Sequence, residues 1–376
     1  MGTQMEAVVL GWYILTLTDS PFLVGLISAT RMSLNILALF AGAIADRVPR
    51  QRLLATVEFV MAFLGVMMLL LILSGRLEVW HIFVIAMFAG MVRVFQMPSS
   101  QSMVADILPQ DRIGNGAAIS TVGMNLAMLI GPLAGALLFN SFGPKGAYMA
   151  IASLYFLSGL FALGIRIVAR SAPRERESVF QAVIGGLKHV KGNQVLWGAL
   201  LLTLIIESSG WTFHTTLMPV FAREVLQTDA KGLGFLLFAF GVGALTGSIG
   251  LSMIPNLRHV GKLMILTVVL WHCTILVFAT TQSFYMSAAI LAFTGMGFGS
   301  TQVFLLTTLL RTTGSEYRGR VIGLRSLAIY AFALGSISSG AMAGIWGAPR
   351  AANVVGVMGI TLVLVLALFT PKLRRF

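Results

Sequence analysis

Long apolar stretches follow one another along almost the whole chain, and their length constrains the fold more than any other feature. A helix of about 20 apolar residues crosses the hydrocarbon layer of a bilayer. Apolar residues make up 57% of the 376 residues and charged residues only 10%, against about 25% charged in a soluble domain. We therefore predict a multi-pass, all-α membrane protein. The predicted spans are 21–45, 53–74, 79–106, 115–139, 145–167, 195–221, 230–254, 261–280, 283–311, 321–345 and 349–370.

The first apolar run is shorter than the others. It covers Met5 to Thr18, and Asp19-Ser20-Pro21 ends it. A helix of this length falls short of the roughly 30 Å of hydrocarbon. The stretch GWYILTLTDSPFLVGL resembles the end of helix one and the start of helix two in exporters of the major facilitator superfamily. We therefore expect a total of twelve helices, the first of them lacking about ten residues at its N-terminal end.

Basic residues are distributed unevenly between the two sides of the predicted membrane. The net charge is +13, and most of the 26 Lys and Arg residues fall in alternate loops and the C-terminal tail. Cytoplasmic loops of membrane proteins carry this excess. The pattern therefore predicts a protein of the inner or plasma membrane with a cytoplasmic C-terminus, and it argues against a nucleic-acid-binding surface. The lone Cys273 excludes an intramolecular disulfide.

The two halves of the chain share a weak repeat at an offset of about 205 residues. Phe88, Gly90 and Met91 recur as Phe293, Gly295 and Met296. A polar linker separates the halves, and its second part has the apolar spacing of an amphipathic helix. We expect this helix to lie on the cytoplasmic leaflet. The predicted division is an N-terminal six-helix bundle (1–168), a cytoplasmic linker with the amphipathic helix (169–194) and a C-terminal six-helix bundle (195–376).

A basic loop with one acid, GAIADRVPRQR, joins two predicted spans. Gly42, Asp46, Arg47 and Arg50 in this loop resemble the signature loop of the major facilitator superfamily, which joins the second and third helices of that family. The chain departs from the motif at Pro49, where glycine is usual, and at Gln51, where a base is usual. The resemblance implies a fold of two pseudo-symmetric six-helix bundles. The simpler alternative is an ordinary basic turn between two spans.

Two further motifs resemble the drug- and siderophore-exporting branch of this superfamily, the branch of enterobactin and macrolide exporters. Gly131, Pro132 and Gly135 partly match its antiporter motif; a helix kink or close packing is the alternative reading, since proline removes a helix hydrogen bond. Before the predicted span 321–345, Arg318, Gly319 and Arg320 resemble an RGR element. The resemblance implies that Asp46, with its pKa held low by neighbouring arginines, docks near this element as a conformational latch.

Polar residues inside spans are costly in lipid and are functional candidates. The resemblance places some of them on helices that line a central cavity. A carboxylate there could carry a proton from outside to inside, or could belong to a structural ion pair. We expect Glu58 to snorkel or to pair with Arg52. The candidate cavity and coupling residues are Glu6, Arg31, Asn35, Arg93, Glu207, Trp211, His214 and Gln302.

These features predict a secondary transporter that works by alternating access. Proton-coupled efflux of a drug-like or siderophore-like compound is the function expected first, and an uncoupled facilitator or an importer of a metabolite is the alternative. A membrane enzyme or sensor is disfavoured because the five His residues are scattered and neither a metal-ligand spacing nor a phosphate-binding loop is present. We expect a monomer in the lipid bilayer, without cofactor or metal, that binds a small molecule and protons.

Overall fold

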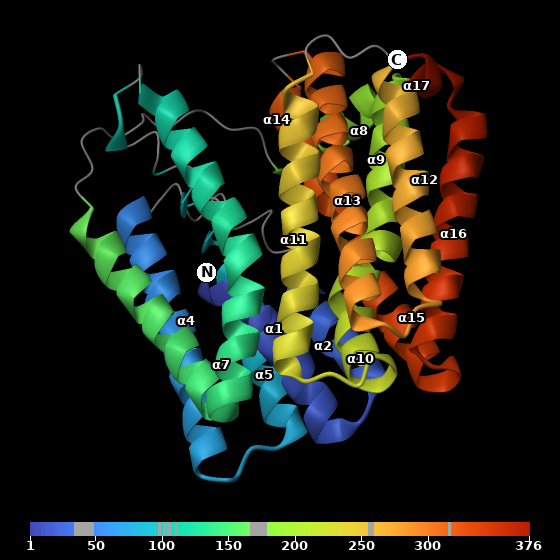
Figure 1. Cartoon of the computed structure of the whole chain (residues 1–376). Helices are drawn as coiled ribbons and strands as arrows, with labels where there is room; N and C mark the ends of the chain where they lie inside the picture. Colours follow the sequence, from blue (N-terminus) through green and yellow to red (C-terminus); the bar gives the residue numbers. More distant parts are fainter. Residues whose placement is uncertain are drawn as a thin grey trace. The chain divides into compact units, whose positions relative to one another are not determined.

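Helices dominate the computed structural model, which describes residues 1–33, 49–96, 99–100, 103, 107–109, 112–165, 179–254, 259–314 and 317–376. The chain forms two compact units (Figure 1). Unit 1 comprises Met1–Leu17 and Thr30–Arg176, and unit 2 comprises Thr18–Ala29 and Glu177–Phe376. The predicted all-α fold is confirmed. The division of the chain into three segments, with a separate linker, stays a prediction.

Unit 1 contains five helices within its described residues, one of them shared with unit 2. The bounds of these helices are α1 (Gly2–Thr18), α2 (Pro21–Ser33, whose first part belongs to unit 2), α4 (Arg50–Leu73), α5 (Val79–Arg93) and α7 (Ile113–Gly164). The long α7 covers the two predicted spans 115–139 and 145–167. Gly143 separates them, because its φ of 66° is a left-handed conformation that glycine adopts readily.

Helix α1 lies very close to α7 because two glycines of α7 face it. A Cβ atom on Gly131 would lie 2.7 Å from Cβ of Gln4, and one on Gly135 would lie 3.0 Å from Cα of Met5. Small residues allow such close approach between helices in lipid. Helical dihedrals continue through Pro132, and Gly143 is the non-helical position within α7. The two glycines therefore set the position of α1, while a kink at Pro132 stays a prediction.

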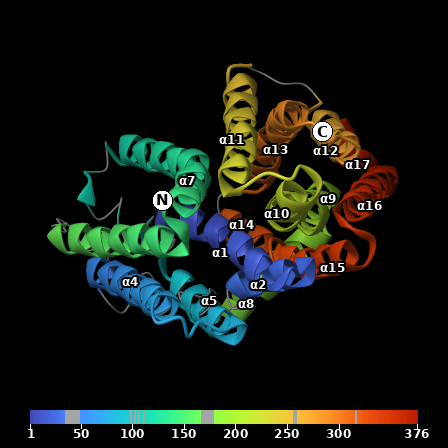
Figure 2. The ribbon, with the colours of Figure 1, turned by 60° about the horizontal axis from the view of Figure 1, so that its bottom comes forward.

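Unit 2 has a central helix with several others around it. Figure 2 shows α9 and α10 surrounded by α11, α13, α12, α16 and α15. The helices of this unit are α8 (Val179–Lys191), α9 (Gln194–Ile206), α10 (Met218–Val220), α11 (Ala230–Ser252), α12 (Val260–Phe278), α13 (Phe284–Thr312), α14 (Arg318–Ala328), α15 (Ala331–Trp346), α16 (Ala348–Phe369) and α17 (Pro371–Arg375).

The helix that begins with α9 alternates between α-helical and π-helical hydrogen bonding. Three π-helical segments follow: η3 (Glu207–Trp211), η4 (Phe213–Leu217) and η5 (Phe221–Val225). A π-helical turn is rare and is frequently found at functional sites. The predicted span 195–221 therefore exists as a helix, but its later part departs from the α-helical spacing on which the sequence analysis relied.

Glycines bring α11 and α13 into direct backbone contact. A Cβ on Gly243 would collide with the carbonyl oxygen of Ala292, and one on Gly295 would collide with that of Phe240. Gly247 and Gly299 repeat the arrangement further along the same two helices. This interface depends on the absence of side chains, as is typical of helix packing in lipid.

The amphipathic helix of the linker region is α8, and one of its faces contacts α14. A Cβ on Gly186 would lie 3.2 Å from Cδ1 of Leu324. The His189 ring stacks on Tyr317 with centroids 4.2 Å apart, and the Arg320 guanidinium lies 4.9 Å from the centre of the Tyr317 ring. The helix is thus held by the start of α14. Its placement on a leaflet stays a prediction.

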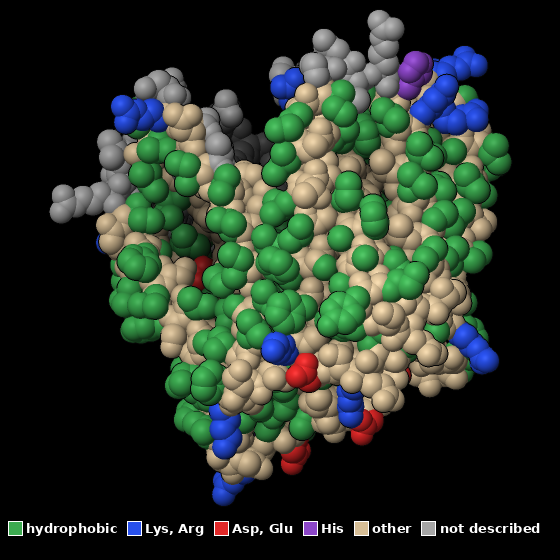
Figure 3. Space-filling model, viewed as in Figure 1, with side chains coloured by type: hydrophobic (Ala, Val, Ile, Leu, Met, Phe, Trp, Pro, Cys, Tyr) green, Lys and Arg blue, Asp and Glu red, His purple; other side chains and the backbone are tan. Residues whose placement is uncertain are grey.

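Eight helices within the described residues are long and apolar enough to cross a membrane, and Pro21–Met32 and Val79–Arg93 are shorter apolar helices. On the face of unit 2 shown in Figure 3, apolar side chains cover the middle, and charged side chains gather at the two ends. A band of this kind matches the hydrocarbon layer with polar regions on either side.

Candidate functional site

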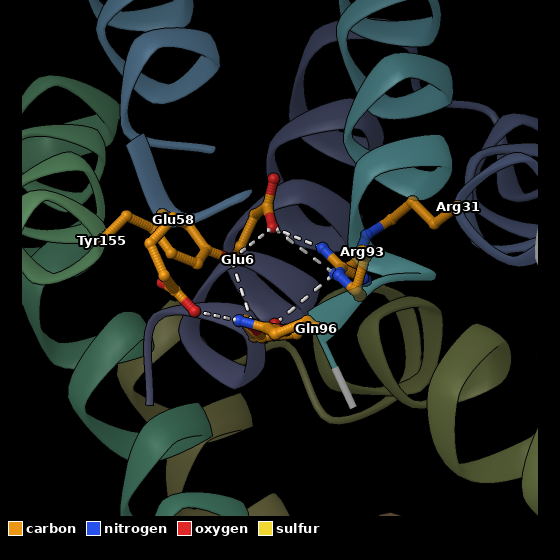
Figure 4. Close-up of polar contacts among 7 residues, drawn as sticks. Glu6, Arg31, Glu58, Arg93, Gln96 and Tyr155 are labelled. Carbon is orange, nitrogen blue, oxygen red and sulfur yellow. Dashed lines mark hydrogen bonds and ion pairs between the residues drawn. The ribbon is translucent and has the colours of Figure 1, made fainter. Parts of the chain in front are cut away.

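A buried carboxylate in unit 1 is approached by two arginines (Figure 4). Glu6 on α1 is 7% exposed. Its Oε2 accepts a hydrogen bond from Nη2 of Arg93 at 2.8 Å, and Nη2 of Arg31 lies 3.7 Å from the same atom. The structure therefore brings together three of the predicted cavity residues, from α1, α2 and α5.

Two uncharged groups complete the environment of this carboxylate. The Tyr155 hydroxyl, from α7, lies 3.1 Å from Oε2 of Glu6 and 3.1 Å from Oγ1 of Thr3. Arg31 also donates to the backbone oxygen of Thr3 at 3.4 Å. Oε2 thus has three partners on three other helices. We call Glu6, Arg31, Arg93 and Tyr155 the unit 1 cluster.

The charges of the unit 1 cluster do not cancel. One carboxylate faces two guanidinium groups, and the Nε atoms of Arg31 and Arg93 are buried without a hydrogen-bond partner. An uncompensated buried charge is costly. Both arginines therefore depend on this one carboxylate for a counter-charge.

The expectation for Glu58 was wrong. Glu58 is 4% exposed and accepts a hydrogen bond from Nε2 of Gln96 at 2.6 Å, whereas Arg52 is exposed at the start of α4. The acid is thus buried against Gln96, which follows the end of α5 by three residues. Helical spacing could not reveal this, because it does not tell which helices are adjacent.

Unit 2 holds a second group of polar residues on three helices. Glu207 is buried at the end of α9, and its carboxylate attracts the guanidinium of Arg325 on α14. Nη2 of Arg325 donates to Oε1 of Gln302 on α13 at 2.5 Å. We call these three residues the polar layer. Glu207 and Gln302 are predicted site residues, whereas the sequence analysis missed Arg325.

Aromatic side chains lie one helical turn from the polar layer. Trp211 follows Glu207 by four residues, and Phe298 precedes Gln302 by four. The Trp211 and Phe298 rings stack with centroids 5.0 Å apart, and the rings of His214 and Phe240 stack at 3.7 Å. Trp211, His214, Phe240 and Phe298 form what we call the aromatic layer.

A glycine pair makes room for a large residue behind the aromatic layer. Gly210 and Gly297 both face Trp271, at 2.7 Å and 3.0 Å for a Cβ atom on each. The next residue, His272, is buried and hydrogen-bonds to Oγ of Ser209 and to the carbonyl of Val268, each at 2.8 Å. His272 is therefore a fully bonded packing residue.

The latch residues of the N-terminal half are outside the described residues. This applies to Gly42, Asp46 and Arg47, and also to the candidate Asn35; for Arg50 the structure gives only its place as the first residue of α4. In the other half, Arg318 and Gly319 are exposed at the start of α14, and Arg320 lies against α8. The latch stays a prediction.

The residues that the sequence analysis missed carry recognisable signals. Tyr155 is a hydroxyl-bearing residue within an apolar span, and Arg325 is a charge well inside the predicted span 321–345. Arg325 lies five residues after the basic RGR element, which made it resemble a loop charge. Within the part of the chain that is described, no cluster of His, Cys, Asp and Glu is arranged to hold a metal ion.

Comparison with known proteins agrees with this architecture. The sequence model of the transmembrane secretion effector family matches residues 1–374. The chain is 22% identical to the staphyloferrin A transporter of Staphylococcus aureus, over 100% of this chain and 94% of that protein. It is 23% identical to the multidrug efflux pump Tap of Mycolicibacterium fortuitum, covering 100% and 93%. The enterobactin exporter EntS of Shigella boydii is 23% identical, covering 96% and 86%.

Solved structures of transporters share the fold. A bacterial homologue of the human lysosomal transporter Spinster, inward-facing and unoccupied, superposes with a TM-score of 0.78 at 12% identity, covering 99% of this chain and 95% of that one. A D-xylose–proton symporter gives a TM-score of 0.72 at 13% identity, covering 100% and 98%. These likenesses confirm the fold and, with the relatives above, identify a membrane transporter of small molecules rather than an enzyme. The chain belongs to the transmembrane secretion effector family of the major facilitator superfamily.

Proposed function

We propose that this transporter exports a drug-like or siderophore-like compound across the plasma membrane in exchange for protons. The observation that carries the proposal is the sharing of one buried carboxylate, Glu6, by Arg93, Arg31 and Tyr155. Relatives described as an enterobactin exporter and as a multidrug efflux pump support the direction and the substrate class.

Glu6 is the proposed proton-binding group. While it is ionised, it neutralises Arg93 and holds α1 against α5. When it takes a proton, it keeps a hydrogen bond but loses its charge, and the two guanidinium groups then repel each other. The resulting preference for a different packing of α1, α2 and α5 links the proton to a conformational change.

The membrane gradient supplies the energy. Each proton that enters releases about 2.3 kcal/mol per 100 mV and about 1.4 kcal/mol for each unit of pH difference. A single coupling carboxylate would carry one proton per cycle. This energy is enough to concentrate a neutral compound outside by one to two orders of magnitude at about 100 mV.

We place the C-terminus in the cytoplasm. Helix α17 carries Lys372, Arg374 and Arg375, and the positive-inside rule assigns such a tail to that side. We further propose that the protein works as a monomer, with residues 1–168 and 195–376 as its two bundles and Asp46 as the acid of the latch.

Transport into everted membrane vesicles tests the proposal. Compared with vesicles that lack the protein, vesicles that contain it should take up more 1-naphthoate when energised, and an uncoupler should abolish this difference. Glu6→Gln should abolish the uncoupler-sensitive part, whereas the matched variant Glu58→Gln, at another buried acid among the described residues of unit 1, should keep it. Uptake that persists with the uncoupler would favour the uncoupled facilitator and overturn proton coupling.

A further inference from the structure

We propose that the polar and aromatic layers of unit 2 together form a binding site for a flat aromatic compound that bears an anionic group. The proposal deepens the proposed export function by naming a substrate class, and it rests on that function only for its role in transport. Binding itself can be measured without transport.

The aromatic layer is suited to a ring because its faces are not fully covered. Trp211, His214 and Phe298 are each only partly buried. They come from the π-helical segments and from α13, and their rings lie in a continuous group with Phe240, whose ring centre is 5.5 Å from that of Phe298. A planar ligand can stack on such faces, as aromatic pairs do.

The polar layer is suited to an anion because the Arg325 guanidinium has an N–H donor that is not hydrogen-bonded. One nitrogen donates to Gln302, while Nε is buried and has no hydrogen-bond partner. A guanidinium carries five N–H donors in a fork that matches a carboxylate. Arg325 and Glu207 attract each other but form neither a hydrogen bond nor an ion pair, so the N–H donors of Arg325 are open to a ligand carboxylate.

The distance between the layers sets the shape of the ligand. Both Glu207 and Trp211 on one helix, and both Gln302 and Phe298 on α13, are four residues apart. One helical turn is about 5.4 Å, so the anionic group and the ring centre should be separated by about that distance. Like Nε of Arg325, Nδ1 of His214 is buried without a hydrogen-bond partner. It lies in the aromatic layer and can form a hydrogen bond with a polar substituent on the ring of the ligand.

Three probes of similar size separate the two parts of the site. They are 1-naphthoate (aromatic anion), 1-naphthylmethylamine (aromatic cation) and decahydronaphthalene-1-carboxylate (non-aromatic anion). Calorimetry with the purified, detergent-solubilised full-length protein at pH 7 should show that 1-naphthoate binds at least about tenfold more tightly than either of the others, since hydrogen bonds to charged groups and ring stacking each contribute about that factor.

Matched variants assign the effect to each layer. Arg325→Gln should lower the affinity for 1-naphthoate about tenfold and leave 1-naphthylmethylamine unchanged. Arg311→Gln, on an exposed arginine of α13, should change neither. Phe298→Leu should weaken the binding of 1-naphthoate several-fold, whereas Phe298→Tyr should retain it and so shows that loss of the ring, rather than misfolding, is responsible. Phe293→Leu on the lipid-facing side (64% exposed) is the control.

The outcomes separate this proposal from the proposed function. Equal binding of 1-naphthoate and 1-naphthylmethylamine, or an unchanged affinity in Arg325→Gln, overturns the anion site. An unchanged affinity in Phe298→Leu overturns the aromatic surface. Transport that ignores an uncoupler, together with selective 1-naphthoate binding, would reject proton coupling and uphold the site.

Discussion

The two units use the same kinds of residues in different ways. In unit 1 the acid is the central group: Oε2 of Glu6 is shared by two guanidinium groups and a hydroxyl. In unit 2 the guanidinium is the central group: Arg325 is held by an amide and attracts an acid that it does not touch. The first arrangement supports the proposed proton binding in unit 1, and the second supports the proposed recognition of a ligand in unit 2.

The largest expected effect comes from removing the shared charge of unit 1. Glu6→Gln leaves Arg31 and Arg93 buried without an anion, which should lower the free energy of unfolding by about 3–5 kcal/mol. Glu207→Gln should cost less than half as much, because no direct ion pair is lost. Chemical unfolding in mixed micelles measures both. Equal costs would remove the distinction between the two units.

A double variant sharpens that result. Glu6→Gln combined with Arg93→Gln removes an opposite pair and leaves Arg31 alone, so it should recover about 1–2 kcal/mol relative to Glu6→Gln. Failure to recover any stability would mean that the charges contribute little and that packing of α1 dominates.

The next effect on stability comes from the backbone contact between α11 and α13 in unit 2. Gly243→Ala forces a methyl group into the Ala292 carbonyl and should destabilise the protein by about 3 kcal/mol, at the upper end of overpacking costs. In the same helix, Gly250 has nothing within 4 Å of a Cβ position, so Gly250→Ala should be neutral or slightly stabilising. Thermal unfolding of the two variants in detergent checks the difference, and equal midpoints would contradict the tight interface.

Of the two arginines in the unit 1 cluster, Arg93 should contribute more to stability than Arg31. Arg93 is 2.8 Å from Glu6, and Arg31 is 3.7 Å away with a second bond to a backbone oxygen. Arg93→Gln should cost about 2 kcal/mol and Arg31→Gln about 1 kcal/mol, in the range of hydrogen bonds to charged groups. Unfolding midpoints measure the order, and a larger effect for Arg31 would show that the closer contact is not the stronger one.

The smallest effect concerns the buried histidine of unit 2. Ser209→Ala removes a partner from His272 and should cost about 1 kcal/mol. Ser208→Ala is the matched control, because both serine hydroxyls bond to the oxygen of Ile205, whereas that of Ser209 also contacts His272. If both variants melt at the same temperature, the contact between Ser209 and His272 contributes no net stability.

The length of the apolar stretches predicts much of this fold, whereas the spacing of polar residues along the helices predicts less of the site. The spans around 53–74, 230–254 and 349–370 coincide closely with α4, α11 and α16, because lipid demands helices of a fixed length. The sequence also predicts which residues share a face of one helix, as Glu207 and Trp211 do. The roles of Tyr155 and Arg325 could not be predicted, because they depend on which helices are neighbours, and a helical period carries no such information.

The glycines of α7 illustrate a second limit. The motif predicted a bend or close packing at Gly131, Pro132 and Gly135, and only the three-dimensional structure assigns α1 as the helix that approaches there. Likewise the sequence placed one regular helix over 195–221, whereas hydrogen bonding in the second part is π-helical. Propensities distinguish helix from strand far better than they distinguish one helical pattern from another.

The three π-helical segments make the central helix of unit 2 adjustable in rotation. An α-helix advances by 3.6 residues per turn, so each residue absorbed into or released from a wider turn rotates everything after it by about 100°. Conversion of η3 to α-helical bonding would rotate Trp211 and His214, and an opposite change in η4 or η5 would return the end of the helix to its place. One membrane span would in this way turn its aromatic side chains toward a ligand or away from it.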